Sequence, residues 1–129
     1  MVRVNRSRKA NHYGTVCERR AAKQYGLDLD RASWHDARFQ NGTPVEIKSA
    51  MYRRADGSPG RFRVFRKYHD RLRAAGGWYA FVVYQPRGSG LQVRQMKMTQ
   101  ADRLPLSAWY GAGGHRDSEQ TKLAIEDVF

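Results

Sequence analysis

The residue types best suited to chemistry are an acid and a lysine in the stretch Pro-Val-Glu-Ile-Lys at 44–48, and an aspartate upstream of them. On a strand, Glu46 and Lys48 share one face because side chains alternate between faces. Asp36 precedes Glu46 by ten residues. Two carboxylates on adjacent strands can hold a hard divalent cation such as Mg²⁺, which takes oxygen ligands and keeps several waters. A neighbouring lysine can orient an attacking water and offset charge building on a phosphate.

Whether the two carboxylates meet depends on the turn between their strands. Asn41-Gly42 is a strong hairpin signal, and as a two-residue turn it would point Asp36 away from Glu46. A three-residue loop at 41–43, or a bulge, would instead place Asp36 opposite Lys48 on the Glu46 face. The catalytic interpretation therefore requires the longer loop, and the sequence leaves the register open.

A third carboxylate lies on the first predicted helix. Four apolar residues of this helix fall on one stripe at about 100° per residue: Cys17, Ala21, Ala22 and Tyr25. Glu18 falls in the middle of that stripe, where burial of a carboxylate is unfavourable unless it meets a cation or donors. Two interpretations stay open: Glu18 joins the metal site, or it pairs with a nearby arginine at the edge of the stripe.

The elements that must position these residues follow from periodicity and turn signals. Gly26 ends the first helix, and the short apolar run at 78–84 is typical of a central strand covered on both faces. In chain order we predict a helix at 13–25, a short strand at 29–34, hairpin strands at 36–40 and 44–51, a loop at 55–60, a helix at 65–75, strands at 78–84 and 91–98, and a helix at 120–128. The order predicts an α/β fold.

The length of 129 residues fits a single domain. Within it, we interpret 1–11 as a basic mobile arm and 99–129 as a C-terminal extension. Lys and Arg number 24 against 12 Asp and Glu, which gives a net charge of +12. Such a surface favours a polyanion, most often nucleic acid. Nine basic residues are predicted to hold phosphates: Arg6, Arg8, Lys9, Arg53, Arg54, Arg61, Arg63, Arg66 and Lys67.

Several other classes are excluded by composition. The single cysteine excludes a disulfide framework and a multi-cysteine zinc site. No apolar stretch approaches the roughly 20 residues that span a bilayer, and the N-terminus has no apolar targeting segment. We therefore expect a cytoplasmic protein with no membrane partner.

Asp36 followed by Glu46-x-Lys48 resembles the D…E-x-K signature of the PD-(D/E)XK nuclease superfamily, with His35 in place of the usual preceding proline. Gly-Thr-Val-Cys-Glu-Arg at 14–19 is similar to the G-x-x-x-E-R pattern on the first helix of archaeal Holliday-junction resolvases. The resemblance covers about 13–98.

This resemblance implies a restriction-endonuclease-like αβββαβ core, with a central mixed sheet flanked by helices. It implies a structure-selective endodeoxyribonuclease that depends on Mg²⁺ or Mn²⁺ and acts on branched or duplex DNA, in the manner of a Holliday-junction resolvase in recombination and repair. Asp36, Glu46 and the carbonyl of Ile47 would ligate the metal, Lys48 would position the water, and Glu18 would support the metal or its waters. Family analogy also implies a homodimer.

Two rival functions fit the same residues. A non-catalytic basic nucleic-acid-binding protein would share the charge distribution without requiring the acidic residues and Lys48 to converge. A restriction-type endonuclease would share the metal site and add sequence-specific contacts. The sequence does not distinguish a four-way junction, a flap, a duplex site or RNA as the substrate.

Overall fold

A computed structural model describes residues 6–106, 108–112 and 115–129, and within these ranges the side chains except those at 6–11, 112 and 115–118. Its elements are α1 (Arg6–Tyr25), β1 (Asp28–Leu29), β2 (Ala37–Arg38), β3 (Pro44–Met51), β4 (Arg61–Phe65), α2 (Arg66–Ala74), β5 (Trp78–Arg87), β6 (Gly90–Gln100), the 3₁₀ turn η1 (Ala101–Arg103), β7 (Tyr110–Ala112), β8 (His115–Ala124) and α3 (Ile125–Val128).

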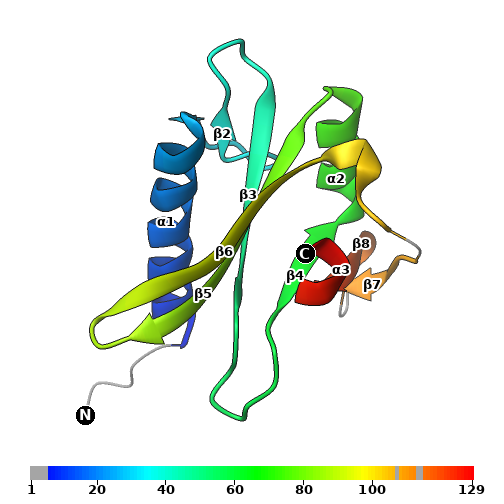
Figure 1. The fold of residues 1–129 in the computed structure, drawn as a ribbon. Helices are drawn as coiled ribbons and strands as arrows, with labels where there is room; N and C mark the ends of the chain where they lie inside the picture. The colour runs from blue at the N-terminus through cyan, green and yellow to red at the C-terminus, as the bar shows by residue number, and fades with distance from the viewer. Residues whose placement is uncertain (1–5, 107, 113–114) are drawn as a thin grey trace.

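A mixed sheet forms the centre of the molecule (Figure 1). Its strand order is β1-β2-β3-β5-β6, and β3 runs parallel to β5 while the other pairs are antiparallel. A smaller antiparallel sheet has the order β4-β8-β7. The predicted α/β fold, a central mixed sheet flanked by helices, is confirmed.

Helix α1 covers one face of the central sheet. Cys17 and Ala21 are fully buried there against Val45 of β3 and Val82 of β5. The helix ends at Gly26, whose φ of 65° suits a residue without a side chain. The apolar stripe predicted from the sequence is thus the surface that fixes α1, and with it Glu18, on the sheet.

The opposite face of the sheet is covered by α2 and by the smaller sheet. Leu72 of α2, Phe62 of β4 and Leu123 of β8 pack with Phe81 of β5 in a second core. Strand β5 belongs to both cores because its side chains alternate between them, which explains why 78–84 is apolar throughout. The region at 99–129, predicted as an extension, therefore contributes to the core of the molecule.

Several predicted boundaries were wrong. Helix α1 begins at Arg6, so 6–11 form its first turns, in keeping with the helix-favouring Arg, Lys and Ala there. The strand predicted at 29–34 is limited to Asp28–Leu29. After it the chain turns on the hydrogen bonds Asp30 N to Asp36 O (2.9 Å) and Ala32 N to His35 O (2.8 Å).

Two further differences concern the smaller sheet. Arg61–Phe65 forms β4, which was not predicted, and its Phe62 and Val64 point into the core while the arginines between them are exposed. The helix predicted at 120–128 was wrong except for Ile125–Val128, because 120–124 pair with β4 as part of β8.

Candidate active site

Asp36 immediately precedes β2, and its carboxyl group hydrogen-bonds with that of Glu46 on β3. Ala37 pairs with Val45, and the backbone N–H of Asp36 donates to Val45 O at 2.9 Å. The Asp36 carboxylate accepts a hydrogen bond from the backbone N–H of Ile47 at 2.9 Å. The Asp36 carboxylate thereby takes the place of a backbone carbonyl as the acceptor for Ile47 N–H on β3. This bond holds Asp36 beside Glu46.

The turn is the longer one that the catalytic interpretation requires, but its position differs from the prediction. Phe39 N donates to Thr43 O at 2.9 Å, so the loop comprises 40–42 rather than 41–43. Gly42 has a φ of 89°, and the Asn41 side chain accepts from Thr43 N at 3.0 Å. This closure pairs Ala37 with Val45, whereas a loop at 41–43 would have placed Asp36 opposite Lys48.

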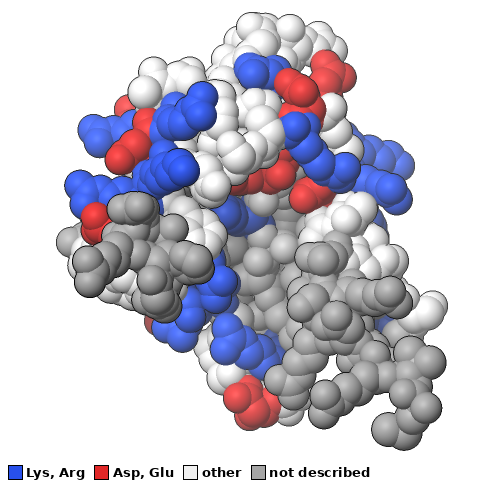
Figure 2. Space-filling model, turned by 180° about the vertical axis from the view of Figure 1, so that it is seen from behind, with Lys and Arg blue, Asp and Glu red and all other residues white. Residues whose placement is uncertain are grey.

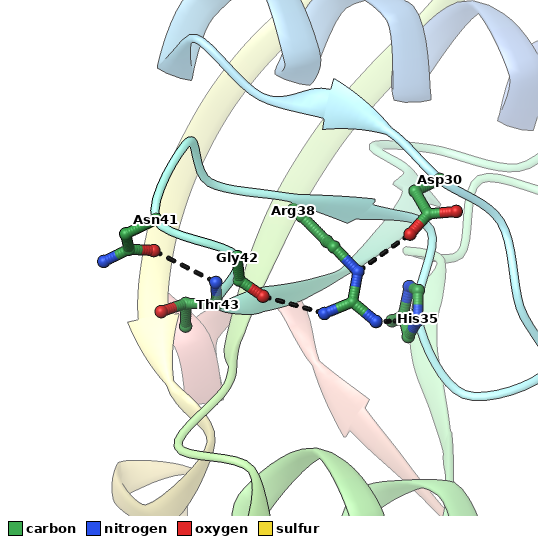
Figure 3. Close-up of polar contacts among 6 residues, drawn as sticks. All are labelled: Asp30, His35, Arg38, Asn41, Gly42 and Thr43. Atoms are coloured by element: carbon green, nitrogen blue, oxygen red, sulfur yellow. Dashed lines mark hydrogen bonds and ion pairs between the residues drawn. The ribbon is translucent and has the colours of Figure 1, made fainter.

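Arg38 holds this hairpin in place (Figure 3). Its guanidinium donates to Asp30 Oδ2 (2.8 Å), to Gly42 O (2.7 Å) and to His35 Nε2 (3.2 Å). Since a guanidinium only donates, His35 Nε2 must accept and the ring carries its proton on Nδ1. Within the described part of the chain that buried Nδ1 has no hydrogen-bond partner. His35 is 3% exposed, so it supports the frame behind Asp36 and does not line the site.

Glu46 is half-buried next to Asp36. Burial, followed by the hydrogen bond with Asp36, raises the pKa of Glu46 to about 9, although the Lys48 charge acts in the opposite direction. Tyr79, the β5 neighbour of Glu46, is itself buried. The Glu46 carboxyl group therefore retains its proton near neutral pH when no cation is bound.

Glu18 approaches the same pair from α1. It accepts two hydrogen bonds from Arg31, from Nε at 3.0 Å and from Nη2 at 2.7 Å. Its pKa is raised, mainly by burial and also by the Asp36 charge, while Arg31 lowers it. Glu18 also contributes to the raised pKa of Glu46. Both interpretations of Glu18 thus find support: it has an arginine partner, and it lies within electrostatic reach of the two carboxylates.

Arg31 is the residue of this site that sequence reasoning missed. It lies on the loop between β1 and β2 and reaches Glu18 on α1. No local pattern marks it, because the contact depends on how that loop packs against the helix. The side chain is about half exposed, which leaves its guanidinium accessible to a substrate.

The donor set suits a hard cation. Among the described residues, no group of three or more His, Cys, Asp and Glu side chains is close enough to enclose a metal ion. Mg²⁺ does not need such a group, because one or two carboxylates with several retained waters suffice. A protonated carboxyl group beside a second carboxyl group is also a site where a divalent cation can replace the proton. Asp36 and Glu46 therefore fit Mg²⁺ or Mn²⁺.

The predicted phosphate-binding residues separate into groups. Arg53 and Arg54 follow β3 and, with Arg61, line one hollow. Arg63 is exposed on β4, and Lys67 on the first turn of α2. Arg66 lies beside it and pairs with Glu119 at 3.2 Å, so its charge is partly offset. The side chains of Arg6, Arg8 and Lys9 lie outside the described part of the structure.

One face of the molecule brings the two signs of charge together. Figure 2 shows acidic side chains in its upper middle, with Lys and Arg side chains beside them and continuing below. A polyanion that approached this face would be attracted by the surrounding cations toward the carboxylates. The carboxylates in turn need a cation before a phosphate can approach them closely.

Comparison with known protein families identifies the family of this chain. A family model described as PD-(D/E)XK nuclease superfamily domain matches residues 4–129. The match includes the region beyond residue 98, which the resemblance seen in the sequence did not cover. No match was found among curated proteins or among solved structures. No helix in the described ranges is long and apolar enough to cross a membrane.

Proposed function

Because the chain belongs to the PD-(D/E)XK nuclease superfamily, we propose that it is a metal-dependent endonuclease whose active site comprises Asp36, Glu46 and Lys48. The observation that carries this proposal is the hydrogen-bonded pairing of the Asp36 and Glu46 side chains across the hairpin. That pairing puts the two carboxylates of the family signature on neighbouring strands, with Lys48 two residues along the same face.

Each residue has a distinct role in this proposal. Mg²⁺ or Mn²⁺ held by Asp36 and Glu46 would supply Lewis acidity toward the phosphate. Lys48 orients the attacking water and offsets negative charge on the phosphate as it builds. The Ile47 carbonyl completes the donor set.

Glu18 is proposed to support the metal or its waters. Arg31 orients the Glu18 carboxylate through its two hydrogen bonds. Glu18 lies on α1 and Arg31 on the loop between β1 and β2, so neither belongs to the β2–β3 hairpin. Loss of either side chain should therefore weaken the reaction less than loss of Asp36 or Glu46.

For the substrate, we propose DNA, with a preference for branched structures in the manner of a Holliday-junction resolvase, cleaved by a homodimer. The basic side chains around the carboxylates support a nucleic-acid substrate. The position of Glu18 beside the pair supports the resolvase comparison. A homodimer would allow two strands of one junction to be cut.

The test is cleavage of a labelled four-way junction, a duplex, a fork and an RNA of matched sequence. Cleavage should require Mg²⁺ or Mn²⁺ and should stop in EDTA. Cutting that persists in EDTA would contradict the metal site. Binding of all four without cleavage would favour a non-catalytic nucleic-acid-binding protein, and cutting at one duplex sequence would favour a restriction-type enzyme. Sedimentation of the protein with the junction measures the proposed dimer.

A further inference from the structure

A hollow of about 930 Å³ lies at the end of β3 that is remote from Glu46. It is enclosed by α1, by the loop between β3 and β4, and by the end of β5. These segments gather at the same end of the molecule in Figure 1. The side chains that matter for its chemistry are Tyr13, Met51, Arg53, Arg54, Arg61 and Tyr84.

The loop that carries the arginines is held by hydrogen bonds. The Gln85 side-chain amide bonds both backbone groups of Arg53, accepting from its N–H at 3.0 Å and donating to its carbonyl at 3.2 Å. Arg54 N donates to Ser58 O at 2.7 Å, and Gly60 N donates to Met51 O at 2.8 Å. The backbone of this loop is therefore braced before any substrate arrives.

Gly60 shows how closely the two ends of this loop approach. A Cβ placed on Gly60 would lie 2.5 Å from the backbone oxygen of Met51, which is closer than two atoms can come without a shift. Any side chain here would push the loop off β3. The arginines of the hollow are therefore presented on a backbone that tolerates little displacement.

The hollow combines cations with an aromatic wall. Arg53, Arg54 and Arg61 supply three positive charges, and Asp56 is the acid among the lining residues. The Asp56 carboxylate already accepts from Ser58 N at 2.9 Å and Ser58 Oγ at 2.6 Å. On the α1 side, the half-buried Tyr13 ring rests on Tyr84, with ring centroids 5.4 Å apart.

Arginines with an aromatic ring are the combination that binds single strands, since the cations follow the backbone phosphates and the ring stacks on a base. The volume is that of a pocket for a few nucleotides or a small ligand, too small to take a duplex. Glu46 and Met51 are five residues apart on β3, about 16 Å at the rise of a strand.

We propose that this hollow is a subsite for an unpaired strand of the nucleic-acid substrate, with its phosphates on Arg53, Arg54 and Arg61 and one base on Tyr13. The inference rests on the proposed nuclease function and narrows its substrate class. The enzyme then prefers a substrate in which a duplex or junction carries an unpaired arm.

The test compares a duplex with the same duplex carrying a short unpaired arm. Binding is measured by fluorescence anisotropy in EDTA, on a Glu46→Gln background that cannot cut. The arm should strengthen binding about tenfold. Arg53→Gln with Arg54→Gln should remove most of that gain, so the duplex with the arm loses more affinity than the plain duplex does. Arg103→Gln, an exposed arginine outside the hollow, is the matched control and should leave the gain intact.

Tyr13 gives a second measurement. Tyr13→Leu should lower the gain from the arm, whereas Tyr13→Phe, which keeps the ring, should preserve it. A photoreactive base in the arm should crosslink to residue 13. Equal binding of both substrates, or equal loss on both in the arginine variant, would overturn the inference, and melting curves show whether each variant is folded.

The two proposals fail in different ways. If the protein prefers the arm in EDTA but never cuts with Mg²⁺ or Mn²⁺, the nuclease function fails and the subsite stands. If it cuts but shows no preference for the arm in binding, the function stands and the subsite is wrong.

Discussion

Asp36 and Glu46 reach each other because a side chain replaces a backbone group: the Asp36 carboxylate binds Ile47 N on the neighbouring strand. Asp36→Asn and Glu46→Gln should each lower the cleavage rate at least about a hundredfold, since each would remove one of the proposed metal ligands. Binding of DNA in EDTA should be unchanged or stronger, because a negative charge near the phosphate is lost. Initial rates and anisotropy on the same preparations measure both. Loss of binding in proportion to loss of rate would show that the residues are structural.

Glu46 also makes the metal-free protein sensitive to pH. Its pKa rises from the ordinary 4.5 to about 9 on folding, chiefly through burial. The folded state therefore binds more protons than the unfolded state between these values. Its contribution to the free energy of unfolding is fully present below about pH 4.5 and is lost as the pH rises toward 9.

Urea unfolding in EDTA over a pH series checks this sign. Glu46→Gln cannot titrate, so it should lose less stability than the wild type between neutral pH and about pH 9. Glu126→Gln, at an exposed position on α3, is the matched control and should follow the wild type. Parallel curves for Glu46→Gln and the wild type would mean that the carboxyl pair is already solvated.

At the scale of elements, the β2–β3 hairpin depends on Arg38, which ties its turn to the preceding loop. Arg38→Gln should lower the free energy of unfolding by about 1 to 2 kcal/mol, because the Gly42 carbonyl and the buried His35 ring lose their donor. The cleavage rate should fall while DNA binding in EDTA is kept, since Asp36 is displaced and the basic surface is not. Arg87→Gln, an exposed arginine on β5, is the control. A full cleavage rate in Arg38→Gln would show that the hairpin keeps its register without the hydrogen bonds of Arg38.

Helix α1 brings Glu18 to the site, and one pair of variants decides between its two roles. Glu18→Gln should lower cleavage at least about tenfold, which is roughly 1.4 kcal/mol in the transition state, and added Mn²⁺ should restore part of it. Arg31→Gln removes the same ion pair and leaves the carboxylate. If Glu18 serves only the ion pair, both variants should cleave normally and change stability by less than about 1 kcal/mol.

The elements that could be predicted were those whose pattern is local. Asn41-Gly42 indicated the hairpin and the run at 78–84 indicated β5, because turn chemistry and burial on both faces leave a mark in adjacent residues. Strand β4 alternates as Arg-Phe-Arg-Val-Phe, which is a strand pattern, but the following helix obscured it. Strand β8 has a polar sequence and is a strand because β4 pairs with it, a contact between Phe62 and Leu123 that no local pattern records.

The same limit applies to the site. The signature predicted Asp36, Glu46 and Lys48 as one set, and alternation along a strand places Glu46 and Lys48 on the same face. It could not give the register, which the Asn41 side chain and Gly42 decide. The contact between Arg31 and Glu18 depends on the packing of a loop on a helix, and sequence spacing contains no measure of that.

At the scale of the whole molecule, the net charge is +12, and the face drawn in Figure 2 carries Lys and Arg side chains beside the acidic ones. Binding of nucleic acid should therefore weaken steeply with salt, because each bound phosphate releases a condensed counterion. One hollow is lined by three arginines, Arg53, Arg54 and Arg61. Their contribution to the salt dependence of binding can be measured by replacing them.

Replacing all three with Gln should reduce the slope of log K against log salt by about two to three, at roughly 0.7 to 0.9 for each phosphate that is no longer neutralised. Binding is measured by anisotropy in EDTA on the Glu46→Gln background, so that no cutting alters the substrate during the titration. Replacing Lys23 and Arg103, which are exposed elsewhere, tests whether total charge alone sets the slope. An equal reduction per charge in this control would mean that nucleic acid responds to the overall field. A reduction confined to the triple variant would mean that the phosphates sit on these arginines, because counterion release follows direct binding and net charge at a distance mainly changes the rate of association.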